Sequence, residues 1–203
     1  MLPENIIFVG VLINLVGLFW YIRDIIKGGT KPNLVSWFFW SLAPFIGVFF
    51  QLKAGAGISI LPIFMAGFTS LVVIIVSVLK KNGYWKINSF DVVCGIISLF
   101  ALILYVFTHN LSISILFAII SDGLAYIPTI RKSWNFPETE TGLMYTTGIV
   151  SNIIGLLTIK MWTFPIYSFG VYIILFNAIV VFSIYRKKIL NMLYFRNDKQ
   201  NEK

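Results

Sequence analysis

Long apolar runs alternate with short polar segments along the whole chain. Seven runs are separated by segments rich in Gly, Pro, Asn and Lys. A helix needs about 20 apolar residues to cross the hydrocarbon layer, where its backbone must satisfy its own hydrogen bonds. The pattern therefore predicts an all-α integral membrane protein with seven transmembrane helices, at about 5–26, 34–52, 58–79, 89–108, 111–130, 142–159 and 164–185.

The basic residues support this count and predict an orientation. Fourteen of the sixteen Lys and Arg residues lie in the loops after the first, third and fifth runs or after the seventh, and two, Lys53 and Lys160, lie on the alternate side. Cytoplasmic loops of membrane proteins carry the excess of Lys and Arg. We therefore expect the N-terminus outside and the C-terminus in the cytoplasm. Residues 1–4 hold no basic residue, unlike a signal peptide, so we expect the first run to be retained.

Composition excludes several classes of protein. Hydrophobic residues make up 58% of the chain and charged residues 12%, against about 25% charged in soluble domains. The net charge of +8 is explained by the loops, so we expect no nucleic-acid partner. The single cysteine and the single histidine, Cys94 and His109, give no disulfide and no metal-binding cluster. We expect no cofactor and no enzyme activity.

Short segment matches predict an internal repeat. A shift of 105 residues aligns segment 21–27 (YIRDIIK) with 126–132 (YIPTIRK), and a shift of 103 aligns 61–64 (LPIF) with 164–167 (FPIY). Both triples of runs begin outside and end inside, and the fourth run connects them. We predict a 3+1+3 arrangement of parallel repeats: 1–82, first bundle; 83–110, linker helix; 111–188, second bundle; 189–203, polar cytoplasmic tail. Parallel repeats place a binding site at their interface near mid-membrane.

One segment resembles the signature of a known family. Segment 125–134 (AYIPTIRKSW), followed by 137–142 (PETETG), is similar to the PQ-loop signature of the SWEET sugar transporters. Pro128 takes the proline position, Thr129 replaces the glutamine, and the first repeat has Arg23 and Asp24 instead. The resemblance implies a SWEET-like fold, alternating access, and a gate or hinge at Pro44, Tyr126 and Pro128. It leaves the substrate open.

A second family is the alternative. Segment 37–40 (WFFW) resembles the tryptophan-rich motifs of nicotinamide riboside transporters, which share the 3+1+3 plan. This resemblance implies a nucleoside-like vitamin precursor as solute. A third reading is a non-transporting membrane receptor on the same fold, similar to the ER retrieval receptors, but the predicted spans offer no Arg or Lys to grip a peptide terminus.

Polar residues inside the runs are the candidate binding residues. Asp122 lies near the middle of the fifth run, where a carboxyl group is costly and usually faces a cavity or a partner. We expect it to couple protons or bind solute; the alternative is a structural clasp between helices. Asn14, Asn152 and Asn177 lie at similar depths and offer donors and acceptors to a solute or to a neighbouring helix.

Aromatic residues complete the predicted site. Trp40, Tyr145 and Tyr172 are candidates for stacking on a solute, whereas Trp37 lies nearer the cytoplasmic end and is expected at the lipid interface. In the loops, Glu138 and Glu140 are expected to form a local salt-bridged turn with the nearby basic residues rather than a catalytic pair.

These observations predict a membrane transporter of a small neutral or zwitterionic solute, a sugar or similar. We expect it in the plasma membrane, in a bacterial inner membrane given its compact plan. Its partners are the solute and the lipid bilayer. Because one chain contains both bundles, a monomer suffices, and a homo-oligomer is also compatible.

Overall fold

The computed structural model describes residues 3–80, 84–107 and 110–201, so His109 lies outside the described residues. The described part of the chain is all-helical, with short 3-10 turns and without strands. Its helices are α1 (Ile7–Ile26), α2 (Leu34–Lys53), α3 (Leu61–Leu79), α4 (Ser89–Phe107), α5 (Leu111–Asn135), α6 (Gly142–Leu157) and α7 (Phe164–Asn201). Each predicted run therefore corresponds to a helix.

Five of these helical segments are long and apolar enough to cross a membrane, as in a multi-pass membrane protein. They are Glu4–Ile26, Leu34–Lys53, Ile58–Leu79, Leu111–Asn135 and Phe164–Arg186. The apolar segments of α4 and α6, Ser89–Phe100 and Gly142–Leu157, are shorter. At 1.5 Å per residue, the 16 residues of α6 span about 24 Å, less than a hydrocarbon core of about 30 Å.

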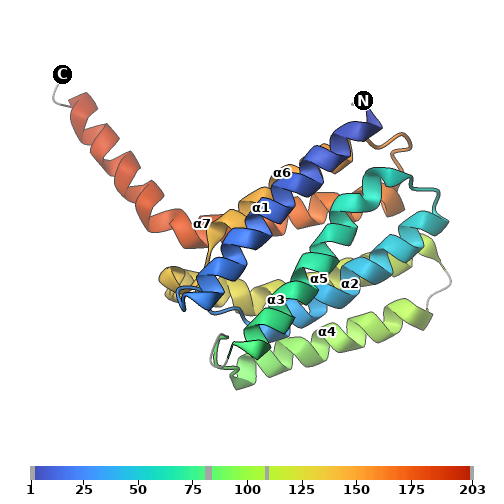
Figure 1. Ribbon diagram of the computed structural model, residues 1–203, viewed down its shortest axis with the longest axis horizontal. Coiled ribbons are helices and arrows are strands. Elements are labelled where there is room, and N and C mark those ends of the chain that lie inside the picture. The colour runs from blue at the N-terminus through green and yellow to red at the C-terminus, as the bar shows by residue number, and fades with distance from the viewer. Residues whose placement is uncertain (1–2, 81–83, 108–109, 202–203) are drawn as a thin grey trace.

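Two helices run further than the sequence pattern predicts. α5 continues to Asn135, so Arg131 and Lys132 lie in its last turns rather than in a loop. α7 continues to Asn201, and its C-terminal part projects away from the other helices (Figure 1). Apolar runs mark the lipid-crossing part of a helix, whereas helical backbone continues into polar sequence until a terminating residue stops it.

Local sequence explains where several helices begin. Asn33 and Asn110 accept backbone N–H groups at the starts of α2 and α5, at 3.1 Å from Val35 N and 3.0 Å from Ser112 N. At the start of α4, the Asp91 carboxylate accepts the Asn88 N–H while the Asn88 side chain accepts the Asp91 N–H, each at 3.1 Å. Such bonds satisfy backbone N–H groups that have no partner within the first turn of a helix.

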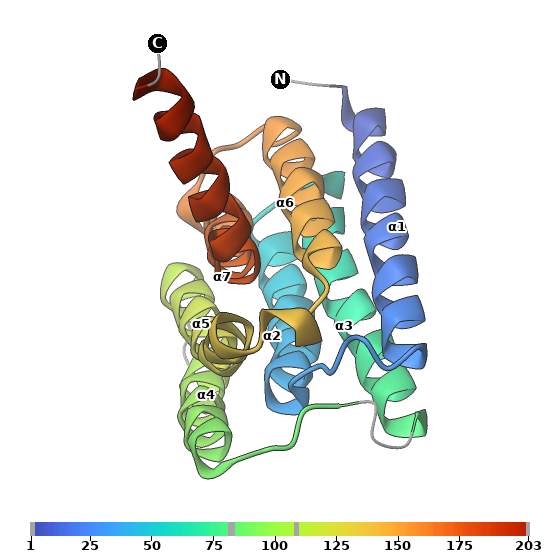
Figure 2. The ribbon, with the colours of Figure 1, turned by 90° about the vertical axis from the view of Figure 1, so that its left-hand side faces the viewer.

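The helices pack in a regular pattern. α3 contacts both α1 and α2, and α7 contacts both α5 and α6. The most extensive contacts between these two sets of helices are those of α1 with α6 and of α2 with α5. α4 lies at the edge against α5 and α2 (Figures 1 and 2).

Small residues allow the close contact between α1 and α6. A Cβ atom on Gly17 would lie 1.9 Å from Thr147 Oγ1, and one on Gly10 would lie 3.3 Å from Ser151 Oγ. Glycine at these positions lets the two backbones approach, as in other membrane helix pairs.

Candidate functional site

A small cavity lies in the middle of the bundle. Its volume is about 50 Å³; since a water needs about 10–15 Å³ of such space, it has room for a few waters in this conformation. Every helix except α4 contributes to its lining, which consists of Asn14, Trp37, Trp40, Pro44, Ala66, Thr69, Ser70, Asp122, Tyr126, Met144, Tyr145, Gly148, Asn152, Ile173 and Asn177.

Most of the candidate residues lie at this cavity. Of the predicted binding residues, the lining includes Asn14, Trp40, Asp122, Tyr145, Asn152 and Asn177. Tyr172 lies behind it, in contact with Asp122. Of the predicted gate residues, Pro44 and Tyr126 line the cavity, whereas Pro128 lies inside α5 and outside the lining.

Asp122 is buried, with 2% of its surface exposed. Its Oδ2 accepts a hydrogen bond from the Tyr172 hydroxyl at 2.9 Å. Its Oδ1 is also buried and has no hydrogen-bond partner among the described residues. One carboxyl oxygen thus links α5 to α7, and the other is unpaired among the described residues.

The three asparagines differ in how they are held. Asn177 Oδ1 accepts a hydrogen bond from the Tyr126 hydroxyl at 2.8 Å, which links α7 to α5. Asn152 donates to the Gly148 carbonyl on its own helix at 2.9 Å. Asn14 Oδ1 is buried without a partner in the described part of the chain. Asn177 therefore joins two helices, which is the alternative role expected for the asparagines, and Asn14 has an oxygen free to accept.

The expectation that Trp37 lies at the lipid interface is wrong. Trp37 is 2% exposed and lines the cavity. Its ring centroid lies 5.2 Å from that of Trp40, which in turn lies 4.2 Å from that of Tyr126. The Trp40 indole donates to the Asp122 carbonyl at 3.4 Å. Depth along the run misled the prediction, because the side chain faces the other helices rather than the lipid.

Helical spacing could have identified Trp37. It precedes Trp40 by three residues and Pro44 by seven, so all three share one face of α2.

Thr69 and Ser70 of α3 could not have been identified in this way. Both line the cavity, but their hydroxyls bond to the Ala66 carbonyl, as hydroxyls commonly do inside helices. Their positions carry no signal that distinguishes them from other Ser and Thr residues in the runs.

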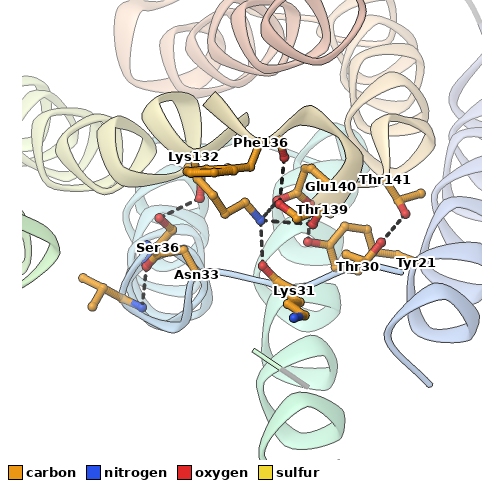
Figure 3. Close-up of polar contacts among 12 residues, drawn as sticks. Tyr21, Thr30, Lys31, Asn33, Ser36, Lys132, Phe136, Thr139, Glu140 and Thr141 are labelled. Carbon is orange, nitrogen blue, oxygen red and sulfur yellow. Dashed lines mark hydrogen bonds and ion pairs between the residues drawn. The ribbon is translucent and has the colours of Figure 1, made fainter. Parts of the chain in front are cut away.

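A second polar group, the Lys132 cluster, lies at one end of the bundle (Figure 3). It consists of Lys132, Glu140 and Tyr21. Lys132 and Glu140 form an ion pair whose side chains are 1% and 0% exposed. The other Glu140 oxygen accepts from the Tyr21 hydroxyl. The expected local pair at Glu140 is thus present, but it is buried and reaches across to α1; Glu138 is exposed.

The Lys132 cluster ties together two loops far apart in sequence. Lys132 Nζ donates to the Lys31 carbonyl at 2.6 Å, between α1 and α2, and the Lys31 N–H donates to the Thr139 carbonyl at 3.0 Å, between α5 and α6. Thr141 donates to Asp24 Oδ2 at 2.8 Å nearby. These contacts close this end of the bundle, called below the Lys132 end.

Further cavities lie toward the opposite end, called below the Lys160 end. A cavity of about 10 Å³ shares Asn152 with the central cavity. It also shares Ser59, Ile159 and Ile166 with an outer cavity of about 240 Å³. The outer cavity includes Glu4 and Lys160, which form an exposed ion pair at 2.5 Å. A chain of cavities thus leads from the Lys160 end to the centre.

Comparison of the chain with protein-family models, with curated proteins and with solved structures finds no match.

Proposed function

We propose that this protein is a membrane carrier for a small solute, which moves by alternating access between two triple-helix bundles. The observation that carries the proposal is a polar, aromatic-lined cavity in the middle of apolar helices, closed at the Lys132 end and approached by cavities from the Lys160 end. Ionisable and amide groups in the membrane interior are costly and mark solute pathways.

The 3+1+3 arrangement is supported by the helix contacts. In two equivalent bundles, α1 corresponds to α5, α2 to α6 and α3 to α7. The contact of α1 with α6 then corresponds to the contact of α5 with α2, and both are present. The same correspondence relates the position of α3 between α1 and α2 to that of α7 between α5 and α6. α4 stands outside this correspondence, as a linker helix does. This two-fold correspondence of contacts supports the proposed pair of repeats.

Aromatic contacts provide independent support for the repeat. Tyr21 and Tyr126 are equivalent under the shift of 105 residues, and so are Trp40 and Tyr145. Tyr126 packs on Trp40 with ring centroids 4.2 Å apart, and Tyr21 packs on Tyr145 at 6.4 Å. Both pairs join one proposed bundle to the other, so equivalent positions make ring contacts on both sides, although the geometry differs.

The proposed solute is small and neutral or zwitterionic, a sugar or a similar compound. The cavity offers amides, hydroxyls, aromatic rings and one carboxyl group, which suit ligands with several hydrogen-bonding groups. We place the protein in the plasma membrane of a bacterium, SWEET-like in fold, with the Lys132 end in the cytoplasm because most basic residues lie on that side.

Solute counterflow tests the proposal. The purified protein is reconstituted into liposomes loaded with one unlabelled solute, and uptake of the same labelled solute is followed, for sugars, amino acids, amines and nucleosides in turn. A carrier exchanges its solute across the membrane, so we expect one class to accumulate transiently above the level in protein-free liposomes. A folded protein that exchanges none of these classes would contradict the proposal.

Matched variants on one helix locate the exchange. Asn177→Ala alters the cavity lining, whereas Ser183→Ala removes a buried hydroxyl of α7 outside it. We expect loss of counterflow in the first and retention in the second. Equal loss in both would place the transport defect in the folding of α7 rather than in the site.

A nucleoside-like vitamin precursor is the second candidate. It is favoured by one observation, the position of both Trp37 and Trp40 at the cavity, because a flat base can stack on such rings. Counterflow of nicotinamide riboside but not of sugars would support this second candidate over a sugar carrier.

A further inference from the structure

The chemistry of the central cavity favours one charge type of solute. Two buried oxygens at the cavity, Asp122 Oδ1 and Asn14 Oδ1, are acceptors without partners in the described part of the chain. No Lys, Arg or His is found among the described residues that line it. Asp122 also takes no part in the ion pairs between described residues. A carboxylate buried in this way needs a positive partner or a proton.

Aromatic residues contact the same aspartate. Trp40 bonds to the Asp122 carbonyl, and Tyr172 bonds to its side chain. Tyr126 lies between these two rings, 4.2 Å from Trp40 and 6.0 Å from Tyr172 by ring centroids. The faces of such rings attract cations within about 6 Å of the centroid. Acceptor oxygens and rings together form a site for positive charge.

One donor lies at the same cavity. Trp37 Nε1 is buried and has no acceptor among the described residues. An indole nitrogen can only donate, so it requires an oxygen on the ligand. A solute with donors at one end and an oxygen at the other would satisfy Asp122, Asn14 and Trp37 together.

We propose that the solute carries an ammonium group, bound by Asp122 Oδ1 among the rings of Trp40 and Tyr126, and an oxygen that accepts from Trp37 Nε1. This inference rests on the carrier function and replaces its neutral solute by an ammonium compound: a small amino alcohol, which is a cation, or a small amino acid, which is a zwitterion. The cavity's small volume sets a size limit in this conformation, which favours ligands of a few heavy atoms.

Binding of two matched ligands tests the inference. Ethanolamine and ethylene glycol differ only in an ammonium group in place of a hydroxyl. A ligand that binds the folded state alone raises the unfolding temperature of the protein. We expect ethanolamine and glycine to raise the unfolding temperature of detergent-purified protein, with an apparent Kd at least tenfold lower for ethanolamine than for ethylene glycol.

Two aspartate variants assign the effect to the cavity. Asp122→Asn is expected to remove the response to ethanolamine, while Asp91→Asn, a buried aspartate at the start of α4, retains it. If Asp122→Asn does not fold, the comparison of the two ligands on the unaltered protein still decides.

The outcomes separate this inference from the carrier function. Equal binding of ethanolamine and ethylene glycol, or retention of the ethanolamine response in Asp122→Asn, would overturn it. Counterflow of a sugar or nucleoside without any response to ammonium compounds would also overturn it, while the carrier function stands. Absence of both binding and counterflow, for every solute class, would overturn both.

Discussion

The buried ion pair of the Lys132 cluster should contribute measurably to the stability of the protein. Lys132 and Glu140 are almost completely enclosed, and each makes further hydrogen bonds, Lys132 to the Lys31 carbonyl and Glu140 to Tyr21. When one partner of a buried pair is removed, the other charge stays buried without compensation, which costs about 3–5 kcal/mol. We expect Glu140→Gln to lower the free energy of unfolding by about that amount.

Thermal unfolding in detergent measures this loss. For a protein of this size, each kcal/mol corresponds to about 2–4 °C, so Glu140→Gln should unfold roughly 6–20 °C lower. Glu138 provides the matched control, because it lies two residues away in the same loop and is exposed. Glu138→Gln should change stability by less than about 0.5 kcal/mol.

A double-mutant cycle tests the reasoning further. Lys132→Met combined with Glu140→Gln removes both charges, so no uncompensated charge remains buried. The double variant should therefore be more stable than the two single losses predict by addition. If Glu140→Gln unfolds at the same temperature as Glu138→Gln, or if the single losses add, the pair does not stabilise the fold as argued.

Three other results are expected. Gly17→Ala should destabilise the protein by about 1–3 kcal/mol in thermal unfolding, since the added Cβ would lie 1.9 Å from Thr147 Oγ1; unchanged stability would contradict the close α1–α6 contact. In a cysteine-free background, Lys160→Cys should react with an impermeant maleimide in intact cells and Lys31→Cys only after lysis. The reverse result would show that the protein has the opposite orientation in the membrane. In the same background, Thr129→Cys places a thiol at a fully buried position, which should react faster with maleimide when Glu140→Gln is added. An unchanged rate would show that the Lys132 cluster does not keep this end of the bundle closed.

The helices could be predicted from sequence because one physical requirement determines them. A backbone in lipid must form its own hydrogen bonds, so each membrane-crossing helix appears in the sequence as an apolar run whose length varies little. The starts of α2, α4, α5, α6 and α7 fall on the predicted residues for this reason and because Asn or Pro stands at several boundaries. The ends of α5 and α7 were not predictable, since helical backbone continues beyond the lipid-crossing residues.

The site was predictable where polarity is rare and not where it is common. Asp122 and the three asparagines stand out within apolar runs, and all four line the cavity. Trp37 was assigned to the wrong environment because apolar side chains suit lipid and protein interior equally. For Glu140 the sequence predicts only contacts within its own loop, because nothing in the sequence indicates that the distant residue Tyr21 lies beside it.

The two halves contribute unequally to the closed end, which bears on how it could open. Both charges of the cluster belong to the second half of the chain, while the first half supplies the Tyr21 hydroxyl and the Lys31 carbonyl. Separation of the halves would therefore break hydrogen bonds but leave the ion pair intact within the second half. Net hydrogen bonds to charged groups contribute about 1.5–3 kcal/mol each, so the two from the first half contribute about 3–6 kcal/mol together, and separating the halves does not add the cost of breaking the buried ion pair. Closure by polar contacts of this kind can populate one state and still be reversed by a ligand of comparable differential affinity, which is what the proposed alternating access requires.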